Sequence, residues 1–254
     1  MFIIHFLINM TIVAVELALV AATGWVAWKQ PLMFAAVTAA LAVILGLRLE
    51  LRRLAFEMPF YFERSGMTGQ VMRALVGSGQ ALMKGVLAGH VALITFSGTE
   101  DARLQIVAAM FAGCVLLGSI LLRRLTISLG AKPAHWGFFR MAAPLGLLFS
   151  GAMSFFPAPS SLQVARKVLL ELPTRPGIAQ AGEALFSLRL WIDDLLVRIM
   201  SGFVGPEGAR AIGIVIGSNV LAGFVIALYA VVVSEVVRVL EEGHWRMRGL
   251  GRRG

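Results

Sequence analysis

The sequence predicts an all-α integral membrane protein with about six transmembrane helices and further amphipathic helices at the membrane interface. Two observations support this fold class. Hydrophobic residues make up 58% of the 254 residues, above the ~45–50% apolar content of soluble domains. Charged residues fall to 15% and gather between apolar runs. This clustering is typical of a polytopic protein whose apolar runs cross the bilayer as helices, since every backbone polar group in lipid must be satisfied within its own helix. Residues 1–254 are therefore expected to form a single polytopic membrane domain.

Six apolar stretches approach the length of about twenty residues that crosses a bilayer core. They cover residues 2–28, 32–47, 75–97, 105–122, 136–156 and 211–234. Trp25 and Trp28 close the first stretch, where amphipathic rings suit a membrane–water interface. The stretch 32–47 is the shortest, so its crossing would need local thinning of the bilayer.

Three further segments carry most of the polar residues. Residues 48–64 interleave arginines with aromatic residues, which predicts a segment on the membrane surface, and Pro59 is expected to break or kink it. The loop 157–210 contains the stretch Ile178–Phe203, whose apolar residues recur at three- and four-residue spacing. That spacing is typical of an amphipathic helix, expected to lie flat on the helix bundle or on the bilayer. A basic tail, 236–254, follows the last stretch.

The distribution of cations predicts the orientation. Residues 48–73, 123–132 and the tail are rich in arginine, whereas six basic and five acidic residues nearly balance in the long loop. Because cytoplasmic loops carry an excess of Lys and Arg, both termini are expected in the cytoplasm and the loop 157–210 outside. The predominance of Arg over Lys favours a bacterial inner membrane. Cations beside membrane lipid headgroups account for the net charge of +9, so no nucleic-acid partner is expected.

Glu16 is the most conspicuous polar residue, because an exposed carboxylate near the middle of a span is costly. The first and third spans run in the same direction. Glu16 lies twelve residues before Trp28 and Lys84 thirteen before Ser97, which places them at similar depth at 1.5 Å per residue. We predict that Glu16 and Lys84 form an intramembrane ion pair. Such a pair could serve a proton or ion relay, or it could fix the register of two helices, and the second interpretation is favoured.

His90 and Asn219 form a weaker set, since both are expected in the outer leaflet and within reach of each other. Interhelical hydrogen bonds of this kind usually serve packing. Two GxxxG pairs, Gly85–Gly89 and Gly213–Gly217, mark faces where helix backbones can approach closely. These faces suit packing within the bundle or the docking of a partner subunit.

The sequence contains no motif for catalysis or cofactor binding. Its four histidines have no i,i+3 or i,i+4 relation, and the one cysteine, Cys114, lies inside an apolar run. No metal or cofactor is therefore expected. The leading hypothesis is a non-enzymatic inner-membrane subunit that assembles with other proteins, for example in a secretion or transfer machine. The alternative is a small transporter or channel using Glu16, Lys84, His90 and Asn219.

Overall fold

The computed structural model describes residues 2–61, 67–97, 101–130, 140–156 and 177–250. Every regular element within these ranges is a helix, which confirms the all-α prediction. Five helical stretches in the described ranges are long and apolar enough to cross a membrane: Phe6–Lys29, Pro31–Ala55, Gln70–Phe96, Asp101–Leu129 and Ala211–Glu242. The chain therefore has the composition and helix lengths of a multi-pass membrane protein.

The first four helices follow one another with short connections. They are α1 (Phe2–Lys29), α2 (Pro31–Tyr61), α3 (Met67–Phe96) and α4 (Asp101–Leu129). Pro31 opens α2 directly after α1, since proline suits the first turn of a helix. The remaining described elements are α6 (Ala142–Met153), α8 (Ile178–Ile216), the short 3-10 helix η1 (Ser218–Leu221) and α9 (Ala222–Leu250).

Three boundaries differ from the sequence prediction. α2 continues without a break to Tyr61, so the described part of 48–64 extends the second helix instead of forming a separate surface segment. The reason is its partner: α3 packs along it, with Gly77 against Leu51 and Leu54. The predicted span 211–234 is interrupted at Gly217, where the backbone leaves the helical region before η1. α9 then runs on through most of the predicted tail, to Leu250.

The predicted span 136–156 corresponds to α6, of which 12 residues are helical. At about 1.5 Å per residue this is roughly 18 Å, short of the ~30 Å hydrocarbon core. Residues 136–139 lie outside the described part of the chain, as does the first part of the predicted loop, 157–176. A helix does lie at the predicted position within that loop: α8 is longer than expected and bends at Gly205 (φ 76°), just before Pro206.

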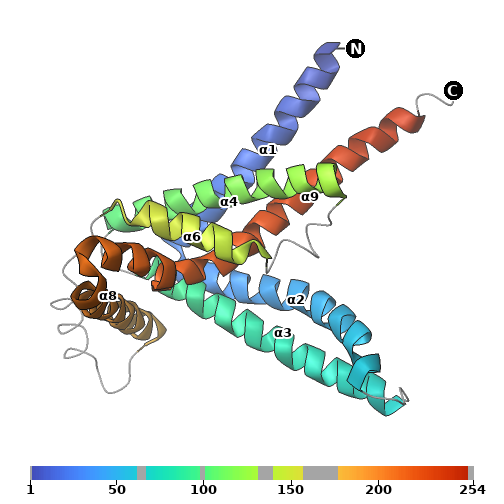
Figure 1. Cartoon of the computed structure of the whole chain (residues 1–254). Helices are drawn as coiled ribbons and strands as arrows, with labels where there is room; N and C mark the ends of the chain where they lie inside the picture. Colours follow the sequence, from blue (N-terminus) through green and yellow to red (C-terminus); the bar gives the residue numbers. More distant parts are fainter. Residues whose placement is uncertain (1, 62–66, 98–100, 131–139, 157–176, 251–254) are drawn as a thin grey trace.

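The helices form two limbs that meet at one end of the molecule (Figure 1). One limb, here called the body, contains α1, α4, α6 and α9; the other is the hairpin of α2 and α3. An aromatic cluster of Phe34, Phe96, Phe111 and Tyr229 joins them, with ring centroids 5.1–6.0 Å apart. Beyond this junction the hairpin diverges from the ends of α1 and α9, which lie together at the far end of the body.

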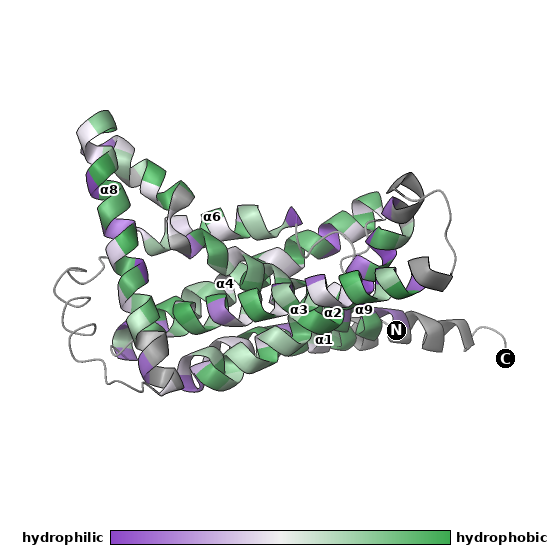
Figure 2. Ribbon diagram, turned by 90° about the horizontal axis from the view of Figure 1, so that it is seen from below, coloured by the Kyte–Doolittle hydropathy of each residue, from purple (hydrophilic) through white to green (hydrophobic). Residues whose placement is uncertain are grey.

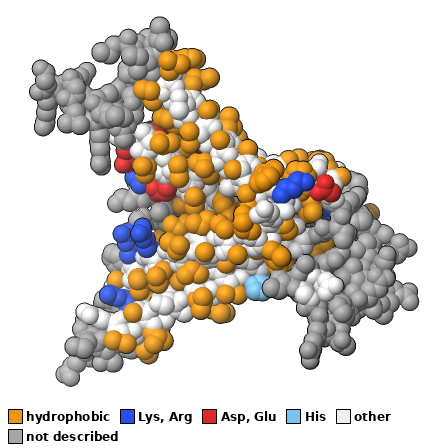
Figure 3. Space-filling view, turned by 180° about the vertical axis from the view of Figure 1, so that it is seen from behind, with side chains coloured by type: hydrophobic (Ala, Val, Ile, Leu, Met, Phe, Trp, Pro, Cys, Tyr) orange, Lys and Arg blue, Asp and Glu red, His pale blue; other side chains and the backbone are white. Residues whose placement is uncertain are grey.

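α8 runs across the junction end, at a steep angle to the other helices (Figure 2). Its predicted apolar stripe, including Leu188, Leu195 and Phe203, is exposed, while Ser187 is buried. Hydrophobic side chains also cover the middle of the molecule between groups of charged side chains at its two ends (Figure 3). A helix with its apolar stripe outward beside such a band suits a position at the membrane interface.

Candidate functional site

Glu16 lies at the interface of α1 and α4 and is only 4% exposed. The hydroxyl of Ser119 donates to its Oε1 at 2.7 Å, and Nη1 of Arg123 donates to its Oε2 at 3.1 Å. Close approach of the two helices brings these groups together: a Cβ on Gly24 would lie 3.2 Å from the carbonyl oxygen of Ala108. Both carboxylate oxygens are thus satisfied, as a buried charge requires.

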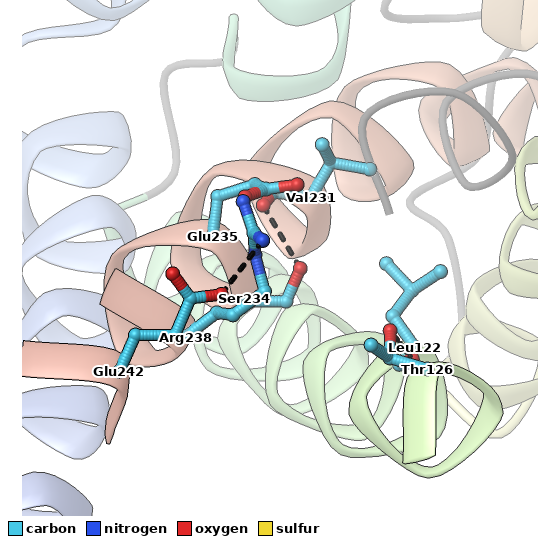
Figure 4. Close-up of polar contacts among 7 residues, drawn as sticks. All are labelled: Leu122, Thr126, Val231, Ser234, Glu235, Arg238 and Glu242. Atoms are coloured by element: carbon cyan, nitrogen blue, oxygen red, sulfur yellow. Dashed lines mark hydrogen bonds and ion pairs between the residues drawn. The ribbon is translucent and has the colours of Figure 1, made fainter. Parts of the chain in front are cut away.

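The same arginine reaches α9. Nη1 of Arg123 lies 3.7 Å from Oε1 of Glu241, so Glu16, Arg123 and Glu241 connect three helices of the body. One turn earlier on α9, Arg238 binds Glu235 at 2.6 Å and Glu242 at 2.9 Å (Figure 4). Charges of both signs therefore alternate at this end of the body, and Arg123 and Arg238 each have carboxylates beside them.

Lys84 does not pair with Glu16; it binds Glu50 on α2. The predicted pair of Glu16 and Lys84 is therefore wrong, because α3 packs against α2 and turns Lys84 towards that helix. Glu50 is only 2% exposed, and its Oε2 has no hydrogen-bond partner within the described ranges. Glu50 was not predicted as a buried charge, because the arginines and aromatic residues of 48–64 are also typical of a segment on the membrane surface. Glu50 follows Ala42 and Gly46 at four-residue spacing, which places all three on one face of α2. This spacing was the signal in the sequence that Glu50 faces a neighbouring helix.

Gly85 and Gly89 are packing residues of the hairpin. A Cβ on Gly85 would overlap Val43 and come within 2.9 Å of the carbonyl oxygen of Ala39, and one on Gly89 would lie 2.9 Å from the Cβ of Ala39. This GxxxG pair therefore packs α3 against α2, as the first of the two interpretations predicted.

The other GxxxG pair has a local role. A Cβ on Gly213 would meet Val197 of the same bent helix at 2.8 Å, and the amide of Gly217 donates to the carbonyl oxygen of Gly213 at 2.8 Å. Gly213 and Gly217 thus shape the end of α8. A close approach of two helix backbones occurs instead at Gly146 of α6 and Gly223 of α9, whose Cα atoms lie close to each other.

Asn219 does not meet His90. Its Oδ1 accepts a hydrogen bond from Nη2 of Arg189, a residue of α8, whereas His90 is exposed and its Nδ1 lies 2.8 Å from the carbonyl oxygen of Val86 in its own helix. Nη1 of Arg189 also donates to the carbonyl oxygen of Ile94 at 3.4 Å. The predicted pair of His90 and Asn219 is therefore wrong, because Arg189 of α8 is the partner of Asn219 and His90 turns outward.

Arg189 is held in an unusual environment for a cation. Burial lowers the pKa of its guanidinium to about 10; nearby Arg103 acts in the same direction and the carboxylate of Asp193 opposes both. The guanidinium still carries its charge at neutral pH. Because a buried charge needs compensation, its hydrogen bonds to α3 and η1 fix α8 to the end of the bundle.

A stripe of five exposed residues and the half-buried Arg73 runs along α3 on a side turned away from α2. It repeats at alternating three- and four-residue spacing, and we call it the α3 seam: Arg73, Val76, Gln80, Met83, Leu87 and His90. Gln80 lies well inside the candidate span Gln70–Phe96. Its side-chain amide is exposed and makes no hydrogen bond within the part of the chain that the structure describes.

The described residues contain no group of three or more His, Cys, Asp or Glu side chains that could hold a metal ion. No protein-family model matches the chain, and no curated protein or solved structure is significantly similar to it. Function must therefore be inferred from the geometry of these sites.

Proposed function

We propose that this protein is a non-enzymatic subunit of a bacterial inner-membrane complex, with both termini in the cytoplasm. A secretion or transfer machine is one example of such a complex. The α3 seam is the observation on which the proposal rests. Heptad-like spacing on an exposed helix face is the pattern by which helices pack side by side, and the seam is left open by α2.

Gln80 indicates whether the neighbour of this seam is a protein helix or lipid. Acyl chains cannot hydrogen-bond an amide, so an exposed glutamine inside the hydrocarbon core carries a desolvation cost. A transmembrane helix packed on the seam could satisfy the amide, and a single polar residue at such a position also sets the register of the pair. We therefore assign the seam to a helix of a partner protein.

The test is site-specific photo-crosslinking in membranes of the native host. A benzophenone amino acid at Met83, which is 73% exposed, should give one discrete protein adduct. The matched control is Leu82, which is 58% exposed and lies on another side of the same helix. Leu82 should give no protein adduct, and Gln80→Leu should weaken the Met83 adduct roughly tenfold or more, since it removes a hydrogen bond and the register it sets.

Two outcomes would contradict the proposal. Equal adducts at Met83 and Leu82 would indicate random collision, and a Met83 adduct that is unchanged by Gln80→Leu would indicate that the seam does not recognise its neighbour.

The transporter alternative gains little from the geometry. Glu16 lies in the body, Lys84 in the hairpin, Asn219 at the junction end, and His90 on an outer face. The four residues therefore do not line one common path among the described helices. Proteoliposomes containing the purified chain would decide the matter: a solute flux abolished by Glu16→Gln would favour a transporter over a subunit.

A further inference from the structure

The α3 seam places a side-chain amide near the middle of its span. Gln80 is the eleventh of the 27 residues in the candidate span Gln70–Phe96, about 5 Å from the midpoint at 1.5 Å per residue. A glutamine amide has one carbonyl acceptor and two N–H donors, so it can exchange hydrogen bonds with an identical amide. A charged side chain could not do so, because like charges repel. The polar group at the centre of the seam is therefore complementary to itself.

The spacing of the seam would align identical residues of two chains. Its positions form two alternating heptad sets, one of Arg73, Gln80 and Leu87 and the other of Val76, Met83 and His90. In a parallel pair of helices, residues of one set pack against their counterparts. Because the sequence sets the orientation in the membrane, two copies related by a twofold axis along the membrane normal have parallel α3 helices. Their Gln80 side chains then lie at the same depth.

Gly79 leaves room for a second backbone beside this amide. It lies three residues after Val76 and four before Met83, so it borders the seam. A Cβ built on Gly79 would have no neighbour within 4 Å in the described chain, whereas the spaces at Gly85 and Gly89 are occupied by α2. Glycine destabilises a helix interior relative to alanine, and no contact within the described chain uses the space at Gly79. Small residues on a helix surface allow another membrane helix to approach closely.

Arg73 is the seam residue whose charge opposes a pair of identical helices. It is the fourth residue of the candidate span and is half-buried in its own chain. The long side chain of arginine can turn its guanidinium towards the interface with water, which keeps two such groups apart. The other seam residues include no Lys, Arg, Asp or Glu, so apolar packing and the amide dominate the rest of the contact.

We propose that the helix on the α3 seam is the α3 of a second copy of this chain, in a parallel twofold pair in which the two Gln80 amides hydrogen-bond each other. This inference rests on the proposed function, which assigns the seam to a protein helix, and it names that helix. Twofold pairs of identical chains are the commonest oligomers. A membrane complex built on the seam therefore contains two copies of this protein.

Disulfide formation between equivalent positions tests the pair in membranes of a heterologous host, where native partners are absent. The background carries Cys114→Ala, which removes the single cysteine of the sequence, and a monodisperse chromatographic profile verifies that it folds. Met83→Cys and Val76→Cys should each give an oxidised dimer with twice the mass of the chain. Leu82→Cys and Leu75→Cys are the controls: they are 58% and 70% exposed on another side of α3 and should stay monomeric.

Variants of Gln80 and Gly79 test the contact itself by sedimentation equilibrium of the full chain in detergent. Gln80→Leu should lower the association constant roughly tenfold, the equivalent of two interhelical hydrogen bonds, whereas Gln80→Asn keeps an amide and should retain most of the association. Gly79→Leu should abolish the dimer by filling the space beside the amide. Its own fold should remain intact, because a Cβ at this position meets no other part of the described chain within 4 Å.

Disulfide yields at Leu82 or Leu75 equal to that at Met83 would overturn the inference, as would unchanged association in Gln80→Leu. Photo-crosslinking from Met83 in the native host separates this inference from the proposed function. Its adduct should have twice the mass of the chain. An adduct with a different protein would overturn the second copy but leave the seam assigned to a protein helix, whereas the absence of both adduct and disulfide dimer would contradict both proposals.

Discussion

The body and the part of the hairpin beyond the junction both rely on close glycine contacts between helices, but they differ in how completely each helix is enclosed by its neighbours. In the body, Gly118 of α4 faces both Ala230 of α9 and Leu145 of α6, and the backbones of Gly146 and Gly223 touch. In the hairpin, Gly85 and Gly89 face α2 alone, and most of the remaining surface of α3 is exposed. A helix segment enclosed on several sides cannot shift to accommodate a change, whereas a segment that packs against one other helix can move away from it.

The two buried carboxylates show the same difference. Glu16 in the body receives donors at both oxygens, from Ser119 and Arg123. Glu50 in the hairpin is bound by Lys84 through Oε1, and Oε2 has no hydrogen-bond partner within the described ranges. Because the body supplies more surrounding groups, it can satisfy a buried charge more completely.

The largest expected effect comes from adding one methyl group in the body. Gly223→Ala would drive its Cβ into the carbonyl oxygen of Ala142 on α6, and we expect a loss of about 3 kcal/mol, at the upper end for overpacking. Gly79→Ala in the hairpin is the matched control, since no atom lies within 4 Å of the added carbon. Its effect should stay within about 1 kcal/mol.

Thermal unfolding in detergent, followed by size-exclusion chromatography, measures both glycine variants. Equal losses of stability in Gly223→Ala and Gly79→Ala would contradict the distinction between an enclosed and an open helix.

The next largest losses of stability are expected when each of the two buried carboxylates is replaced by an amide. Glu16→Gln removes the nearer of the two carboxylate partners of Arg123 and should cost about 2 kcal/mol. Glu50→Gln should cost about 1 kcal/mol, because one oxygen had no hydrogen-bond partner to lose and the flexible stem of Lys84 lets its ammonium move towards water. Denaturant or thermal unfolding of the two variants gives the order, and a larger loss for Glu50→Gln would reverse the comparison.

The smallest loss of stability is expected from the hydrogen bond between Thr38 of the hairpin and Tyr229 of the body. Thr38 donates to the carbonyl oxygen of Phe34 at 2.7 Å, so the hydroxyl of Tyr229, 3.1 Å away, is its donor. Tyr229→Phe should cost about 0.5 kcal/mol, the lower end for one neutral hydrogen bond. A double-mutant cycle with Thr38→Val measures the coupling in the same unfolding assay. Strictly additive losses would show that the hydroxyls do not act together across the junction.

Sequence reasoning predicted helix identity far better than it predicted partners. Glu16 and Lys84 were predicted to pair with each other, but Glu16 pairs with Arg123 and Lys84 with Glu50. Equal depth along two helices leaves the rotation of each helix and the order of its neighbours undetermined. Glu50 was missed for a related reason: its charge follows Arg48 and precedes Arg52, a local pattern that also fits a membrane surface.

The sequence by itself determined that the described chain is all-helical, where most of its long apolar helices lie, and that a further helix precedes the last of them. These properties are local, since apolar length and residue periodicity act within a single helix. Only the tertiary structure decided that Glu16 meets Arg123, that Lys84 meets Glu50 and that Arg189 takes the place of His90 beside Asn219. Those pairings depend on which helix faces lie together, and that is set by packing between segments as much as 107 residues apart.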